Sequence, residues 1–172
     1  MKRSFASLDV QEALQIAIFV EERNADVYHR FAEVFTEFGD EESLEIGSVF
    51  WEMAVEERGH QSLLKQKYDE QYGDAVCSLT EEDLVEFIEV PRLEDGDVLV
   101  GADHGLAARD RALQVALRAE ISAQSYYAQL VEQTPDGPLR SIYRDLAEME
   151  DGHVNYLAAK LAKDEAEEQP IH

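Results

Sequence analysis

Basic residues are scarce in this chain. Its 172 residues include 15 Lys and Arg against 38 Asp and Glu, which gives a formal net charge of −23. Nucleic acids and anionic membrane surfaces are bound through clusters of basic side chains. The charge balance therefore argues against both as partners. It suits a protein that attracts cations, or an acidic surface that keeps the protein in solution.

Cysteine and long apolar runs are also nearly absent. Cys77 is the single cysteine, so neither an internal disulfide nor a CxxC metal site can form. This is compatible with a reducing cytoplasm, where we expect the protein to function. The first residues lack the apolar run of a signal peptide, and no stretch approaches the ~18 apolar residues of a membrane helix. Because hydrophobic residues still make up 45% of the chain, we expect a soluble domain with one core.

Apolar residues recur at intervals of three and four along four long stretches, which is the spacing of amphipathic helices. Gly39 follows the first stretch, Gly73 follows the second, and the turn sequence TPDGP divides the third from the fourth. Short loops within each pair predict two antiparallel hairpins joined by a long crossover. The sequence thus predicts one all-α domain over 1–168, with helices at about 8–38, 42–72, 104–133 and 138–168, a crossover at 73–103 with a short helix near Thr80–Ile88, and a tail at 169–172.

The first helices of the two predicted hairpins have similar sequences. ALQIAIFVE, which ends at Glu21, reappears as ALQVALRAE, which ends at Glu120. Seven residues further on, the same register pairs Tyr28 with Tyr127. Such internal repetition indicates a duplicated hairpin, and the duplication keeps polar residues as well as apolar ones.

The second helices match in the same way. FWEMAVEERGHQSLL begins at Phe50 and aligns with YRDLAEMEDGHVNYL, which begins at Tyr143. In both copies a Glu and a His lie in the middle of the apolar stripe that should face the core. A buried carboxylate costs several kcal/mol unless it is paired or bound to a metal, and two divalent ions would balance four of them. The alignment pairs Glu57 with Glu150 and His60 with His153.

A Glu and a His three residues apart on one helix can reach the same ion. Carboxylate with imidazole suits iron or manganese better than a metal that prefers thiolate. We therefore predict a centre of two iron ions, for which manganese or zinc could substitute. The alternative to a metal centre is a decayed duplication in which both histidines are ordinary core residues. The carboxylates that both copies retain argue against this alternative. We predict that Glu57 and Glu150 bridge the two ions, and that His60 and His153 bind one ion each. Glu21 and Glu120 are the predicted terminal ligands. Tyr28 and Tyr127 are predicted to donate hydrogen bonds to groups that surround the ligands.

Paired glutamate helices and two ExxH helices resemble the superfamily of ferritin, bacterioferritin and rubrerythrin over essentially the whole chain. The segments SFASLDVQEALQIAIFVEERNADVYHRFAE and EMAVEERGH resemble most closely the erythrin subgroup of rubrerythrins, which includes the diiron domain of a membrane-bound ferritin. The resemblance implies a ferritin-like four-helix bundle, a diiron site that reacts with dioxygen or hydrogen peroxide, and a homodimer.

Three departures from the family pattern limit what the resemblance implies. The rubredoxin CxxC pair of rubrerythrins is absent, so electrons would come from an unknown external donor. Many rubrerythrins carry a further glutamate three residues after the third-helix ligand, where this chain has Ala123. The membrane portion of the membrane-bound ferritin is also absent, so iron efflux is not implied.

These observations leave three functions open. The first is a diiron oxidoreductase, either a ferroxidase or a peroxidase-like enzyme, that serves iron homeostasis or defence against oxidative stress. The second is a non-catalytic iron sensor or binding module, to which a partner docks at the acidic crossover. The third is a diiron oxygenase, which would need an apolar pocket for an organic substrate beside the metals.

Overall fold

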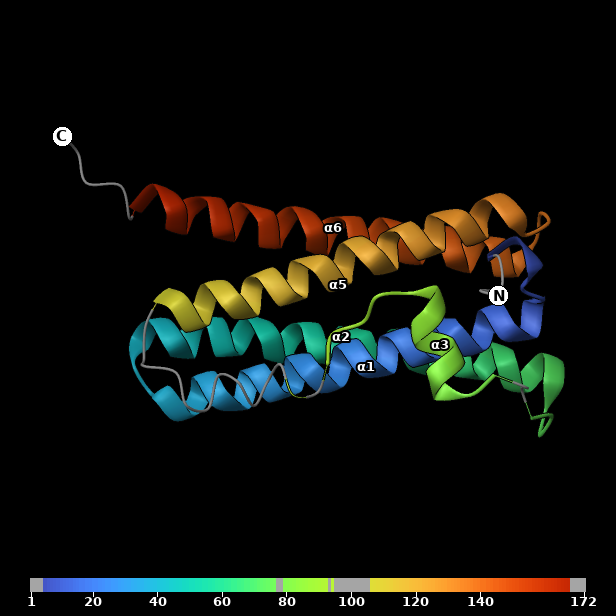
Figure 1. Cartoon of the computed structure of the whole chain (residues 1–172), viewed down its shortest axis with the longest axis horizontal. Helices are drawn as coiled ribbons and strands as arrows, with labels where there is room; N and C mark the ends of the chain where they lie inside the picture. The colour runs from blue at the N-terminus through green and yellow to red at the C-terminus, as the bar shows by residue number, and fades with distance from the viewer. Residues whose placement is uncertain (1–4, 77–78, 93, 95–105, 168–172) are drawn as a thin grey trace.

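The computed structural model describes residues 5–76, 79–92, 94 and 106–167. Within these residues there are helices and no strands. The two hairpins are α1–α2 and α5–α6, and the short α3 of the crossover lies against α1 (Figure 1). This confirms the predicted all-α fold of two hairpins. The elements are the 3-10 turn η1 (Phe5–Ser7), α1 (Val10–Phe38), α2 (Glu41–Tyr72), α3 (Glu81–Phe87), α5 (Leu106–Gln133) and α6 (Pro138–Glu167).

The ends of the first hairpin follow from local chemistry. Asp9 caps α1 by accepting a 2.9 Å hydrogen bond from the backbone N–H of Glu12, whose side chain accepts a bond from the Asp9 N–H in return. Gly39 ends α1 at φ 74°, a left-handed conformation that glycine adopts without strain. Asp40 then caps α2 immediately. Two residues thus reverse the chain, which makes α1 and α2 antiparallel.

The short helix predicted in the crossover is present as α3. Thr80 caps it, and the side chains of Thr80 and Asp83 form the reciprocal bonds of a capping box. The predicted start of the third helix at 104, most of the crossover after Arg92, Cys77 and the tail at 169–172 lie outside the described residues.

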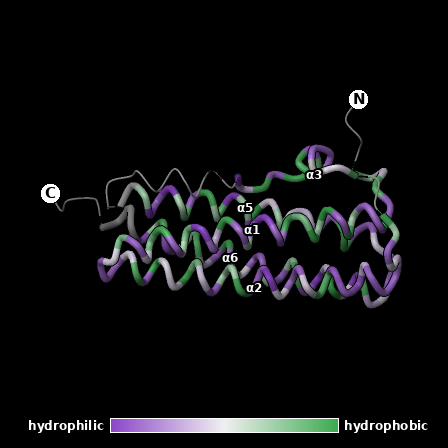
Figure 2. The backbone as a smooth tube through the Cα atoms, turned by 90° about the horizontal axis from the view of Figure 1, so that it is seen from below, coloured by the Kyte–Doolittle hydropathy of each residue, from purple (hydrophilic) through white to green (hydrophobic). Residues whose placement is uncertain are grey.

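The core consists of two apolar clusters with a polar layer between them. One cluster contains residues 13–20 of α1 and 64–68 of α2 together with 123–146 of the second hairpin. The other contains 27–35 of α1, 46–54 of α2, and parts of α5 and α6 at the opposite end of the bundle. Each long helix carries apolar and polar residues along its whole length (Figure 2). Between the clusters every long helix turns a carboxylate inward, and these four side chains are fully buried: Glu21, Glu57, Glu120 and Glu150.

None of the described helices is apolar over a stretch long enough to cross a bilayer.

Candidate metal centre

The six residues predicted as metal ligands lie together in this polar layer. Each hairpin contributes one glutamate from its first helix and a Glu–His pair from its second. The four glutamates are inaccessible to solvent, His60 is buried, and His153 is half-buried. The inward stripe of α2 is buried throughout, at Phe50, Met53, Glu57, His60 and Leu64. Residues far apart in sequence therefore meet because both hairpins turn the same helical face toward each other.

Their ligand atoms form two overlapping groups of four. In each group, one oxygen or nitrogen atom from every residue lies within 4.8 Å of the others. Glu57 and Glu150 belong to both groups. A carboxylate that belongs to both groups can bind a different ion with each of its two oxygens. The groups are Glu21, Glu57, His60 and Glu150, and Glu57, Glu120, Glu150 and His153.

Both histidines turn Nδ1 toward the centre. His60 Nδ1 lies 3.1 Å from Glu21 Oε2 and 3.5 Å from Glu150 Oε1. His153 Nδ1 lies 3.1 Å from Glu120 Oε2 and 3.4 Å from Glu57 Oε1. Each histidine thus contacts the first-helix glutamate of its own hairpin and the second-helix glutamate of the other. One nitrogen of each ring is placed to bind an ion between these carboxylates.

The two tyrosines cross between the hairpins. The Tyr28 hydroxyl donates a hydrogen bond to Glu120 Oε1, and the Tyr127 hydroxyl donates one to Glu21 Oε1. Both rings are fully buried. The sequence predicted hydrogen bonds to surrounding groups, whereas the structure aims each hydroxyl at a predicted ligand of the opposite hairpin. The bonds leave Oε2 of each glutamate facing its histidine.

Without a cation, the layer keeps its charge low by holding protons. Burial, and then the nearby Glu21 and Glu150, raise the pKa of Glu57 well above its usual 4.5. Burial lowers the pKa of His60, but contacts with Glu150 and Glu21 outweigh it and raise that pKa to about 10. Burial also lowers the pKa of His153, but contacts with Glu120 and Glu150 outweigh it and raise that pKa to about 12.

The pKa values of Glu120, Glu150 and the two tyrosines are shifted as well. Burial, followed by the charge of Glu150, raises the pKa of Glu120 well above its usual value. Burial raises the pKa of Glu150, but contacts with Glu120 and both histidines outweigh it and lower that pKa overall. Burial, and then a neighbouring carboxylate, raise the pKa of Tyr28 and Tyr127 well above 10, so both hydroxyls keep their protons.

This layer can hold metal ions. Both carboxylate oxygens of Glu57 and both of Glu150 are buried, and none accepts a hydrogen bond of normal geometry from any described residue. An unsatisfied buried oxygen is unfavourable, and a bound cation removes that penalty. The four orphaned oxygens belong to the two residues that the ligand groups share. The donor set of carboxylates and imidazoles suits iron, manganese or zinc.

One contact with the centre had no signal in the sequence. Glu56, which is mostly exposed, places Oε2 2.7 Å from His153 Nε2. The equivalent atom of His60 is buried and makes no hydrogen bond with any described residue. An outer carboxylate on a ligand histidine fixes the ring and raises its basicity. Because Glu56 and His153 come from different hairpins, no spacing within one helix could have identified the pair.

One solved structure resembles this chain over nearly its full length. It is the crystal structure of an uncharacterized conserved protein from Magnetospirillum magnetotacticum MS-1, with 24% sequence identity and a TM-score of 0.69. The alignment covers 96% of this chain and 99% of that one. The similarity establishes the fold and carries no function. No family model matches the chain, and no curated protein matches it.

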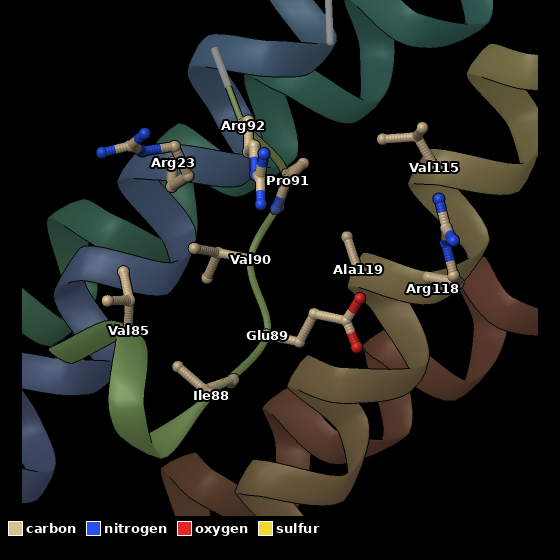
Figure 3. Close-up of a pocket in the computed structure, with 10 residues that line it drawn as sticks. All are labelled: Arg23, Val85, Ile88, Glu89, Val90, Pro91, Arg92, Val115, Arg118 and Ala119. Atoms are coloured by element: carbon tan, nitrogen blue, oxygen red, sulfur yellow. The ribbon is translucent and has the colours of Figure 1, made fainter. Parts of the chain in front are cut away.

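A cavity of about 550 Å³ lies outside the metal centre. Val85 to Arg92 of the crossover form one side of it, and Val115, Arg118 and Ala119 of α5 face them, with Glu89 pointing toward α5 (Figure 3). None of the six predicted ligands lines this cavity. Its three arginines, and the absence of the six predicted ligands from its lining, distinguish it from the apolar pocket that an oxygenase would need beside the metals.

Proposed function

We propose that this chain is a non-haem diiron protein of the rubrerythrin and ferritin type, which oxidises Fe(II) with dioxygen or hydrogen peroxide. The observation that carries the proposal is the pair of buried four-residue groups that share Glu57 and Glu150. Four carboxylates balance two divalent cations, and oxygen with imidazole nitrogen is a donor set that iron accepts. Bound Fe(II) would supply the electrons that reduce the oxidant.

Each predicted ligand has a distinct role in this proposal. Glu57 and Glu150 would hold both ions, because they belong to both ligand groups and their four oxygens accept no hydrogen bond from the described residues. Glu21 and His60 complete the set for one ion. Glu120 and His153 complete the set for the other.

The tyrosines position the terminal glutamates. Each hydroxyl occupies one oxygen of its glutamate, which turns the other oxygen toward the histidine. Because their pKa values are raised, the hydroxyls remain donors at neutral pH. The same bonds tie the first helix of each hairpin to that of the other, so the ligand positions are held across the bundle interface.

We further propose that the protein works as a homodimer and takes electrons from a separate donor. The chain carries no cysteine pair that could hold an internal electron-transfer iron. A non-catalytic iron sensor would use the same centre and differs from the enzyme only in lacking turnover. The oxygenase alternative would need an apolar pocket beside the metals, and none of the predicted ligands lines the cavity beside the crossover.

An anaerobic Fe(II) titration followed by oxidant tests the proposal. We expect saturation at two irons per chain, and the absorbance of oxidised iron after dioxygen or hydrogen peroxide is added. Glu150→Gln should lose both signals. Glu148→Gln, the same substitution at an exposed position two residues away, should keep them. Two irons bound without oxidation would support the sensor, and no stoichiometric iron would refute the centre.

A further inference from the structure

The cavity beside the crossover has the size of a small-molecule site. Its volume is about 550 Å³, within the range of about 300–1,000 Å³ that such sites occupy. The crossover segment from Val85 to Arg92 forms one side of it, and α5 forms the other (Figure 3). None of the six predicted metal ligands lines the cavity, so the proposed diiron chemistry assigns it no occupant.

The charge of this cavity is opposite to that of the chain. Acidic residues outnumber basic ones by 38 to 15 in the whole sequence. Among the ten residues that line the cavity, three are arginines and one, Glu89, is acidic. Because the chain as a whole repels anions, a local excess of positive side chains is the feature that would attract one. The three arginines are Arg23, Arg92 and Arg118.

Two of the arginines lie on opposite sides of the cavity. Arg92 extends from the crossover next to Pro91, and Arg118 lies on α5 across from it (Figure 3). A guanidinium presents its N–H groups in a fixed fork that matches the oxygens of a carboxylate or a phosphate. Arg23 adds positive charge, but its guanidinium lies 5.3 Å from the centre of the Phe19 ring. Arg92 and Arg118 are therefore the side chains best placed to hold an anion.

The rest of the lining is apolar. Val85 is 51% exposed, although an apolar side chain gains free energy from burial. An apolar lining favours a ligand that has an apolar body in addition to its charged group. The apolar lining residues come from the crossover and from α5: Val85, Ile88, Val90, Pro91, Val115 and Ala119.

We propose that this cavity binds a small organic anion, whose carboxylate or phosphate group lies between Arg92 and Arg118 and whose apolar part contacts the valine and isoleucine side chains. The site is additional to the proposed diiron centre and needs no metal. Glu89, which points toward α5, limits the affinity because its carboxylate repels an anionic ligand.

Isothermal titration calorimetry of the full chain with four probes tests the proposal. The protein is first treated with a chelator and dialysed, because anions also bind iron. Octanoate and octyl phosphate combine an anionic group with an apolar body, whereas 1-octanol has only the apolar body and inorganic phosphate only the charge. We expect octanoate or octyl phosphate to bind at one site per chain, at least about tenfold more tightly than 1-octanol and inorganic phosphate. The tighter of the two organic anions identifies the charged group that the site prefers.

Variants at exposed positions locate the site without disturbing the core. Arg92→Gln and Arg118→Gln should each weaken the binding of the tighter probe by about five- to tenfold, because each removes a charged donor. Glu89→Gln should strengthen it by about twofold or more, because it removes a repulsive charge. The matched control is Arg144→Gln on α6, outside the cavity, which should bind the probe as wild type does.

The outcomes decide this inference separately from the proposed function. If neither organic anion binds, or if 1-octanol binds as tightly as they do, the inference is wrong. Binding that is unchanged in both Arg92→Gln and Arg118→Gln would place the anion elsewhere and would also overturn it. None of these results concerns iron, whose binding Glu150→Gln tests, and a chain that binds no iron would leave the anion site standing.

Discussion

Glu57→Gln should change stability and metal binding in opposite directions. Glu57 is fully buried, neither of its oxygens accepts a hydrogen bond from a described residue, and burial raises its pKa above 4.5. A carboxyl group with a raised pKa favours the folded state fully below its unfolded pKa and loses that contribution as pH rises. Between pH 4.5 and the folded pKa, only the folded state keeps the proton. Each pH unit in this interval lowers the free energy of unfolding by about 1.4 kcal/mol. Glutamine has nearly the same shape and takes no part in this titration.

From this direction we expect metal-free Glu57→Gln to be more stable than wild type at pH 7.5, by at most about 4 kcal/mol, and by less than about 1 kcal/mol at pH 5. Urea unfolding of protein treated with a chelator measures both. The same substitution should abolish stoichiometric iron binding, because it replaces an oxygen of a residue that both ligand groups share with an amide nitrogen. Glu148→Gln, an exposed control, should stay within about 0.5 kcal/mol of wild type. A metal-free Glu57→Gln that is less stable than wild type at pH 7.5 would refute the reasoning.

Three further predictions follow from the same layer. Tyr28→Phe and Tyr127→Phe should each destabilise the metal-free protein by about 1–3 kcal/mol in urea, because each leaves a buried glutamate oxygen without its donor; values near zero would mean that these bonds do not form. The folded pKa values of His60 and His153 rise from 6.5 to about 10 and about 12, so their contribution to metal-free stability is complete below pH 6.5 and is lost as pH rises through 10. Urea unfolding between pH 6 and 10 should therefore show declining stability, whereas iron should bind more tightly over that range because it competes with fewer protons. Glu56→Gln should weaken iron binding about tenfold without changing its stoichiometry, since it removes only the outer support of His153; unchanged affinity in a competition titration would contradict this role.

Much of the fold could be predicted because its signals are local. The caps Asp9 and Thr80 and the left-handed Gly39 define helix ends through bonds within four residues, and the predicted boundaries of the described helices agree with the structure to within a few residues. The duplication also allowed the polar layer between the two hairpins to be predicted. Two copies with polar residues at equivalent inward positions must bring these residues into one layer when the hairpins pack face to face.

The contacts between hairpins could not be predicted, because they depend on how far one helix slides and rotates along another. The crossing of Tyr28 to Glu120 and the contact of Glu56 with His153 both depend on this placement.

X-ray diffraction at the iron absorption edge, on crystals grown anaerobically with Fe(II), tests the central claim most directly. The account predicts two anomalous peaks per chain, both in contact with Glu57 and Glu150, one beside His60 and the other beside His153. A single peak, or peaks confined to the acidic surface with none between these glutamates, would contradict it.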